Sequence, residues 1–273
     1  MEGERAAGAV SGETFTCRDR LLQHLLLPVR PAPLAAALKS LLRVRRRVRA
    51  TPHGRFLVDP ATIFALQLAR GGVYEPALVR VLEERLPAGG TFVDLGANEG
   101  YFAVLGARRV GPTGRVVAVE PQARLAPLIR ANLELNGVTW ARVVEAAVAE
   151  SAGTRPLFLT ASTNTGASSF FRGTRYHLPT VEVRTLTLGA LLEESGVEEV
   201  DLLKVDVEGA ELSILEGARQ LLASGRIRAL TLDVHATTLA ARELDPERPR
   251  RLLREAGYRV ERGGGVDVWV RGA

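Results

Sequence analysis

Two stretches of this chain place polar residues where apolar runs end. The first contains Asp94, Gly96, Asn98 and Gly100, and 24 residues after Gly96 a second apolar run closes on Glu120 and Pro121. Glycines allow the backbone to approach a ligand closely, and the amides of a following helix start would lie beside it. A carboxylate at the end of the next strand can accept hydrogen bonds from both hydroxyls of a ribose. The pattern therefore predicts a nucleoside pocket.

Two ligands use such a pocket. The dinucleotide fingerprint G-x-G-x-x-G seats a pyrophosphate on the helix N-terminus, but this chain has Asn98 at the second glycine position and the carboxylate of Asp94 ahead of the turn. A carboxylate repels an anion and attracts a cationic sulfonium that carries an amino group. The pattern favours S-adenosylmethionine over NAD, and a tight turn without a ligand is the remaining alternative.

The second stretch runs from Val200 to Glu211 and contains a lysine inside an apolar strand. Side chains alternate across a strand, so Lys204 and Asp206 share one face. The chain has 34 arginines and only two lysines, which indicates that position 204 needs a compact ammonium. We expect Lys204 and Asp206 in the catalytic group, and the alternative is a structural ion pair that orients Asp206.

Histidine is a suitable general base near neutral pH, and the chain has four histidines. Only His235 lies at the end of a predicted core strand, with Asp233 on the same face. We therefore expect His235 to be the base, unless it is a structural residue bonded to a nearby helix. Asp206, Glu208, Asp233 and His235 could also bind a divalent cation. We expect no metal, because Lys204 already brings a positive charge to Asp206.

An insertion near 154–186 interrupts the alternation of strands and helices. It contains a polar segment that ends in two phenylalanines, and its substrate-contact candidates are Asn164, Ser168 and Ser169. Together with Glu208 and Asp233, they form the expected acceptor side of the pocket. An ordinary surface loop is the alternative to a substrate lid.

These motifs together resemble the FkbM-type S-adenosylmethionine-dependent methyltransferases. The resemblance covers about residues 50–235 and rests on D-x-GANxG-Y from Asp94, on Val119-Glu120-Pro121, on Asn132 and Asn136, and on the K-x-DVEGAE run from Lys204. It implies a class I methyltransferase fold, which is Rossmann-like with a mostly parallel seven-stranded sheet, and methylation of a hydroxyl on a sugar, natural product or other small molecule.

The resemblance also bears on individual residues. Tyr74 and Glu75 match a segment near the amino-acid end of the cofactor, although a helix-capping role for Glu75 competes, and we expect Ala146 to be another cofactor contact. The chain departs from the family pattern twice: Thr187 stands where the family has an aspartate, and Asp233 where it has a glutamate. An NAD(P)-dependent oxidoreductase and a non-catalytic binding protein with the same fold remain the alternative functions.

Length and composition indicate one α/β domain over 50–273 preceded by an N-terminal extension over 1–49. The chain has 273 residues, is 46% hydrophobic and carries one cysteine, so it can bury a large core without an intrachain disulfide. We expect residues 1–20 to be poorly ordered and 21–49 to form short helices broken by prolines. No apolar run reaches 18 residues and no secretory signal is evident, so we expect a cytoplasmic protein.

The periodicity places core strands near 91–95, 115–120, 142–147, 200–206 and 228–235, with hairpins over 48–58 and 258–270. The net charge of +5 is concentrated in Arg43–Arg49, where no aromatic residue interleaves. We interpret that run as a solvated surface and expect no nucleic-acid partner. The expected partner is the small-molecule acceptor, and the sequence is also compatible with a homo-oligomer.

Overall fold

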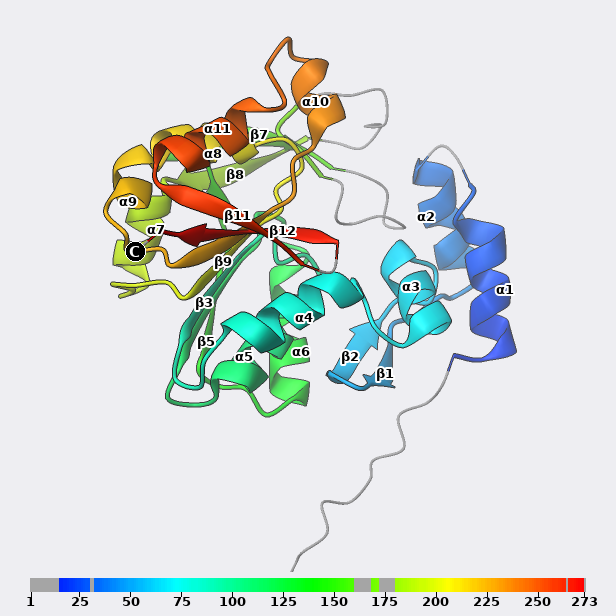
Figure 1. The fold of residues 1–273 in the computed structure, drawn as a ribbon. Helices are drawn as coiled ribbons and strands as arrows, with labels where there is room; N and C mark the ends of the chain where they lie inside the picture. Colours follow the sequence, from blue (N-terminus) through cyan, green and yellow to red (C-terminus); the bar gives the residue numbers. More distant parts are fainter. Residues whose placement is uncertain (1–14, 30–31, 160–167, 172–179, 264, 273) are drawn as a thin grey trace, which may run out of the picture.

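A twisted sheet forms the centre of the molecule (Figure 1). The computed structural model describes residues 15–29, 32–159, 168–171, 180–263 and 265–272. In spatial order the seven strands are β11 (Tyr258–Gly263), β12 (Val266–Arg271), β10 (Ala229–Leu232), β9 (Leu202–Val205), β3 (Thr91–Leu95), β4 (Arg115–Val119) and β5 (Ala141–Val144). The five strands from β10 to β5 are parallel, and β12 is antiparallel to both of its neighbours. The predicted mostly parallel sheet with a closing antiparallel hairpin is confirmed.

Helices cover both faces of this sheet, because successive strand residues point to opposite sides. Phe92 packs into one apolar cluster and Val93 into the other. The Phe92 cluster includes side chains of α3 (Ile63–Gly71), α4 (Pro76–Arg85), α5 (Tyr101–Val110) and α6 (Ala126–Leu135). The Val93 cluster includes those of α7 (Leu188–Glu194), α8 (Glu211–Gly217), α9 (Arg219–Ala223), α10 (Ala236–Ala240) and α11 (Arg248–Glu255). The sheet is therefore doubly wound.

Two predicted strands end three residues earlier than the sequence pattern indicates. The strand expected over 142–147 leaves the sheet after Val144, and Ala147–Val148 forms β6 in a second sheet with β8 (Thr180–Leu186) and β7 (Gly153–Phe158). This is feasible because β5 is an edge strand, so the departing chain finds its hydrogen bonds on β8 instead. The strand expected over 228–235 ends at Leu232, and His235 is the N-cap residue of α10. Both breaks put backbone turns beside the cavity at the carboxyl ends of the strands.

The N-terminal part consists of α1 (Cys17–Leu26), α2 (Ala32–Leu41) and the predicted hairpin of β1 (Arg47–Thr51) and β2 (Gly54–Val58). The expectation of poor order over 1–20 is wrong for residues 16–20. Thr16 and Asp19 form a reciprocal capping box that starts α1, a local signal that composition does not reveal. Residues 1–14 lie outside the described part.

Ion pairs attach these helices to the rest of the molecule. Arg49 pairs with Asp19 of α1 at 2.6 Å, and both side chains are buried. Lys39 of α2 pairs with Asp59 at 2.8 Å, also away from solvent. The interpretation of Arg43–Arg49 as a solvated surface is therefore wrong for Arg49, because strand alternation turns this side chain inward while Arg47 stays exposed.

None of the helices in the described ranges is both long enough and apolar enough to cross a lipid bilayer.

Candidate active site

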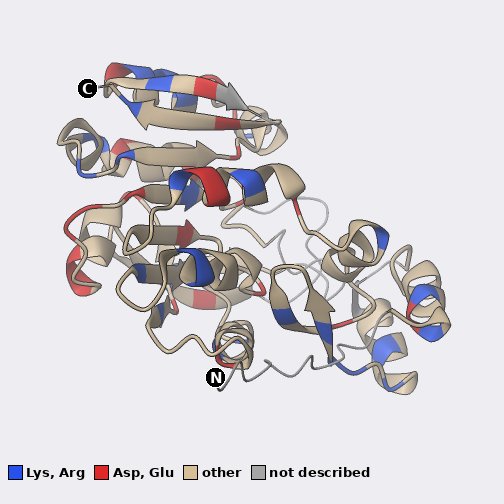
Figure 2. Ribbon diagram, turned by 60° about the horizontal axis from the view of Figure 1, so that its bottom comes forward, with Lys and Arg blue, Asp and Glu red and all other residues tan. Residues whose placement is uncertain are grey.

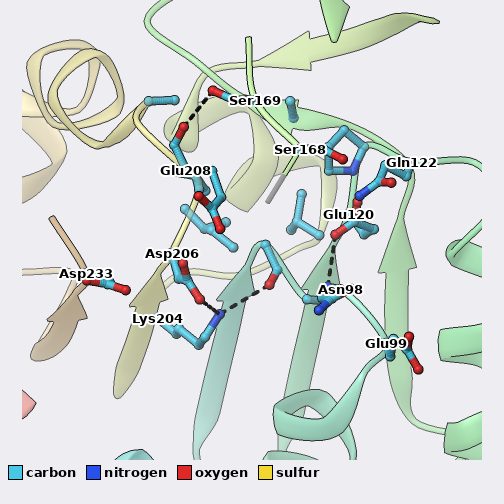
Figure 3. Close-up of a pocket in the computed structure, with 18 of the residues that line it drawn as sticks. Asn98, Glu99, Glu120, Gln122, Ser168, Ser169, Lys204, Asp206, Glu208 and Asp233 are labelled. Carbon is cyan, nitrogen blue, oxygen red and sulfur yellow. Dashed lines mark hydrogen bonds and ion pairs between the residues drawn. The ribbon is translucent and has the colours of Figure 1, made fainter. Parts of the chain in front are cut away.

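The carboxyl ends of β3, β4, β9 and β10 border one cavity (Figure 3). Most of the predicted site residues line it: Tyr74, Glu75, Gly96, Asn98, Glu120, Pro121, Ala146, Ser168, Ser169, Lys204, Asp206, Glu208, Asp233 and His235. Figure 3 shows Asp206, Glu208 and Asp233 on one side and Asn98 and Glu120 on the other. Asp94 and Gly100 are not in the lining, and Asn164 falls outside the described residues.

Lys204 joins two strands beneath the cavity. Asp94 and Lys204 are register partners on the adjacent parallel strands β3 and β9, so their side chains emerge on the same face. The ammonium lies 3.2 Å from Asp94, 3.3 Å from Asp206 and 3.2 Å from the carbonyl oxygen of Gly96, to which it donates a hydrogen bond. The hydrogen bond to Gly96 and the two ion pairs compensate the charge of the ammonium, although the Lys204 side chain is only 3% exposed.

These contacts keep Lys204 charged. Burial lowers the pKa of Lys204, but the carboxylates of Asp94 and Asp206 raise it by more, so the net shift is upward. The same arrangement changes our interpretation of Asp94. We expected its charge to attract the cofactor directly, but the carboxylate is fully buried and faces Lys204. Asp94 is thus linked to Asp206 through Lys204, which contacts both carboxylates.

The glycines of the turn make room for protein as well as for a ligand. Gly96 has φ +79°, and a Cβ at this position would lie 1.9 Å from the backbone oxygen of Asp206. Gly100 has φ +83°, and a Cβ there would lie 3.1 Å from a side-chain carbon of Ile129 in α6. The prediction assigned both glycines to the approach of a ligand; the structure shows that they allow the strand ends and helices to pack closely.

Glu120 closes the other side of the cavity. It is 3% exposed, and its two carboxylate oxygens accept hydrogen bonds from the backbone N–H groups of Asn98 at 2.9 Å and Gln122 at 3.0 Å. Burial raises the pKa of Glu120, and these two hydrogen bonds offset only part of that rise. Each oxygen retains a further lone pair, so the carboxylate can still accept from a ligand hydroxyl.

His235 is held by two carboxylates. Its Nδ1 lies 2.8 Å from Glu211 and its Nε2 lies 3.2 Å from Glu208. Burial lowers the pKa of His235, but the hydrogen bonds to Glu208 and Glu211 raise it by more, to about 11. With both ring nitrogens facing carboxylates, the arrangement favours the imidazolium form and argues against a neutral general base. The catalytic role of His235 stays a prediction.

Asp206, Glu208 and His235 also present ligand atoms that lie within 4.8 Å of one another. A divalent cation could bridge atoms at this spacing only after His235 lost its proton from the facing nitrogen, since a metal ligand must offer a free lone pair. The absence of a metal remains a prediction.

The cavity carries an excess of negative charge. Among the described residues, six carboxylates line it (Glu75, Glu99, Glu120, Asp206, Glu208 and Asp233) and two cationic side chains (Lys204 and His235). Burial, and then the neighbouring carboxylate of Asp206, raise the pKa of Asp233. A ligand that brings positive charge would relieve this repulsion.

Strained backbone gathers at the same cavity. Five non-glycine residues in the described part have positive φ, and three of them line the cavity: Glu75 at +43°, Asn98 at +49° and Glu208 at +54°. Glu75 occupies the N-cap position of α4, yet its side chain makes no capping hydrogen bond, which weakens the capping alternative. Such strain costs about 1–3 kcal/mol per residue and is typical of functional sites.

Several residues of the site were not predicted. Glu211, fully buried, accepts from the backbone N–H of Gly209 at 2.9 Å and holds His235, and its place in the K-x-DVEGAE run was the available signal. Thr62 to Phe64 line the cavity from the start of α3, for which the sequence offered no signal. Ser169 donates to the backbone oxygen of Glu208 at 2.6 Å, so the insertion does contact the site.

The family departure at Thr187 has a structural explanation. Its hydroxyl accepts a hydrogen bond from the backbone N–H of Ala190 at 3.1 Å and caps α7. Aspartate and threonine are both favoured at this position of a helix, so either residue can start α7.

Comparison with known sequences identifies one domain. Residues 94–260 match the model of the methyltransferase FkbM domain. The methyltransferase sdnD of Sordaria araneosa is 30% identical over 160 residues, which span 48% of this chain and 61% of that protein. The AMB antimetabolite synthetase AmbE of Pseudomonas aeruginosa is 29% identical over 213 residues, which span 64% of this chain and 10% of that protein. The match thus spans under two thirds of each relative.

Solved structures share the general arrangement at low similarity. An O-methyltransferase from Bacillus cereus in complex with SAH has a TM-score of 0.43 and 15% identity over 94% of this chain and 98% of its own. A precorrin-6y C5,15-methyltransferase from Geobacter metallireducens has a TM-score of 0.43 and 15% identity over 73% of this chain and 90% of its own.

Replacement of Gly96 should destabilise the whole sheet end. Gly96→Ala is expected to unfold at clearly lower denaturant concentration than Gly225→Ala. Both positions have φ +79°, so both lose roughly 1–2 kcal/mol to a left-handed alanine, but only Gly96 also meets backbone, whereas nothing lies within 4 Å at Gly225. If Gly96→Ala and Gly225→Ala lost the same free energy of unfolding in urea denaturation, the contact between Gly96 and the backbone of Asp206 would not constrain the strand ends.

The protonation of His235 should appear in both its titration and the stability of the protein. We expect NMR of the ring, assigned with His235→Gln, to show a cation throughout the neutral range. A pKa of His235 that is higher in the folded than in the unfolded protein contributes to the free energy of unfolding. This contribution is complete below about pH 6.5, the unfolded pKa, and is lost as the pH rises toward about 11, the folded pKa. The stability difference between wild type and His235→Gln should therefore shrink from pH 7 to pH 10. A ring that titrates near pH 6.5 would restore the general-base interpretation.

Proposed function

Because the chain belongs to the FkbM methyltransferase family, we propose that it transfers a methyl group from S-adenosylmethionine to a hydroxyl group of a small-molecule acceptor. The observation that carries this proposal is the charge of the cavity. Of the six carboxylates that line it among the described residues, Glu99 pairs with Arg46 at 2.7 Å, which leaves five carboxylates against Lys204 and His235. S-Adenosylmethionine brings a sulfonium and an amino group, whereas the pyrophosphate of NAD would add negative charge. The oxidoreductase alternative is disfavoured for this reason.

The two sides of the cavity suit the two ends of that cofactor. Glu120 is the candidate partner of the ribose hydroxyls, as its backbone hydrogen bonds aim both oxygens at the cavity edge. Ala146, Val148 and Leu157 provide an apolar wall next to it for the adenine ring. Glu75 and Asp206 lie among the carboxylates expected to attract the cationic amino-acid end. When bound, the cofactor supplies an activated methyl group, and the protein supplies alignment.

The acceptor hydroxyl must lose a proton, and the carboxylates are the remaining bases. The carboxylate of Asp206 pairs with the ammonium of Lys204 and is suited to hold the acceptor hydroxyl in place. Asp233 is the better proton acceptor, because burial and the charge of Asp206 raise its pKa. His235 then acts as a positioning residue: its positive charge keeps Glu208 and Glu211 together at the edge of the acceptor region.

Cofactor binding provides the first measurement. Glu120→Ala is expected to weaken the binding of S-adenosylhomocysteine by about 1.5–3 kcal/mol, the range for a hydrogen bond to a charged group. Calorimetric titration measures this affinity. Glu145→Ala is the matched control, because this carboxylate is exposed and pairs with Arg130 outside the cavity lining. Tight binding of NADH together with unchanged affinity of Glu120→Ala for S-adenosylhomocysteine would contradict the proposed cofactor.

Turnover separates catalysis from binding. An acceptor screen with mass detection should find a product heavier by one CH₂ group, and Asp233→Asn should lower its rate by roughly 10²–10⁴ while cofactor affinity is retained. Asp245→Asn removes an exposed carboxylate outside the cavity and should leave the rate unchanged. Full activity of Asp233→Asn would transfer the role to Asp206 or to alignment alone. Cofactor binding without turnover on any acceptor class would favour the binding-protein alternative.

A further inference from the structure

The exposed large apolar side chains of the described residues are concentrated in one part of the chain. They are Leu21, Leu25, Leu34, Leu41, Leu42 and Ile63, with exposed fractions between 39% and 76%. The described surface beyond residue 63 exposes no such side chain. Single exposed leucines need no explanation, but a group confined to two short helices and the start of a third indicates a contact surface.

These leucines form stripes on α1 and α2. In α1, Leu21 and Leu25 follow Arg18 at helical spacing, and in α2, Leu34 and Leu41 lie two turns apart on one side. The opposite sides of the two helices pack together in one cluster around Leu22, Leu26 and Ala61. Since the buried sides face inward, both stripes lie on the outer side of the helix pair.

The same region is free of acidic residues in its sequence. From residue 20 to residue 58 the chain contains nine basic residues and neither aspartate nor glutamate. The exposed arginines of this part of the chain are Arg18, Arg20, Arg43, Arg45 and Arg47, and Arg18 donates a hydrogen bond to the backbone oxygen of Leu42. Asp19 is buried against Arg49, so its charge is answered within the protein. Figure 2 shows blue recurring over these helices at the right of the view.

We propose that this N-terminal surface, defined by the exposed leucines of α1 and α2 and these five arginines, docks onto an anionic lipid membrane. Short amphipathic helices with leucines flanked by arginines lie in the plane of a lipid interface, where the apolar stripe enters the acyl boundary and the arginines meet the headgroups. Such binding does not require a spanning helix.

Two other occupants fit this surface less well. A second copy across a twofold axis would bring the same arginines together, which is unfavourable at the rim of an interface. A nucleic acid would neutralise the arginines but would leave the leucines without apolar partners, and no phenylalanine, tyrosine or tryptophan is present between Arg18 and Arg47 for base stacking. An anionic membrane satisfies both the leucines and the arginines.

The surface is fixed relative to the cavity. The buried pair Arg49–Asp19 attaches α1 to β1, and the pair of Lys39 with the half-buried Asp59 attaches α2 to the segment before α3. Ile63, at the start of α3, is 41% exposed and also lines the cavity. Docking would therefore hold one edge of the cavity near the lipid surface, an arrangement suited to an amphipathic acceptor.

Co-sedimentation of the full chain with lipid vesicles tests the proposal without reference to catalysis. We expect the protein to pellet with vesicles of equal parts phosphatidylcholine and phosphatidylglycerol and to stay in the supernatant with phosphatidylcholine alone. Binding should weaken as salt is added, because the charges of the headgroups are screened. Equal sedimentation with both vesicle types, or with neither, would overturn the proposal.

Two variants and a matched control assign the binding to this surface. Arg43→Gln/Arg45→Gln/Arg47→Gln should weaken partitioning roughly 100-fold, at about 1 kcal/mol per arginine near an anionic surface. Leu21→Gln/Leu25→Gln/Leu41→Gln should abolish sedimentation while circular dichroism stays unchanged. Arg109→Gln/Arg219→Gln/Arg259→Gln removes three exposed arginines elsewhere and should bind as wild type does.

If the leucine variant bound vesicles as the wild type does, another surface would hold the membrane. If the control variant lost binding, net charge alone would account for it. A lipid-free wild-type dimer that becomes a monomer in the leucine variant would instead assign this surface to self-association.

Discussion

The ammonium of Lys204 is the interaction on which the site depends. It lies between Asp94 of β3 and Asp206 after β9, and it also bonds the carbonyl oxygen of Gly96 in the turn that follows β3. A buried cation is stable only when its partners are in place, so the register of two strands and the course of the glycine turn are set together. Gly96 completes this arrangement, because a Cβ there would displace the backbone of Asp206. The position of one carboxylate at the cavity thus follows from the packing of the sheet itself.

A cavity with many carboxylates has to be held together by cations. Lys204 serves the side near β3, and the ring of His235 lies on the side near α8, where Glu208 and Glu211 face its two nitrogens and raise its pKa. The remaining imbalance of charge would favour a cationic ligand, as the proposed function requires. Burial, together with repulsion from Asp206, raises the pKa of Asp233 and makes it a stronger base than an isolated aspartate.

The N-terminal part shows how one basic run is divided between two tasks. Strand alternation turns Arg49 inward to the buried Asp19, while Arg47 stays on the outside. The inward Arg49 holds α1, whereas α2 is held by its own Lys39, which pairs with Asp59 before α3. The outward arginines of the run belong to the same part of the chain as the exposed leucines. Attachment by buried pairs is strong because removal of one partner leaves an uncompensated charge. The helices are therefore a fixed part of the molecule that extends the surface next to the cavity.

The sequence alone predicted the alternation of strands and helices and the closing hairpin, because these depend on local periodicity. It also contained the two motifs of the site, the glycine turn with Glu120 and the K-x-DVEGAE run, because their residues lie close together in the chain. The sequence did not predict that Asp94 faces Lys204 or that Glu211 and Glu208 hold His235. Nor did it predict that β5 ends at Val144 and that the following residues pair with β8. These features depend on strand register and on which distant groups share a buried space. The charge state of His235 follows only from the folded arrangement, since a pKa is set by the burial and neighbours of a side chain and not by its place in the sequence.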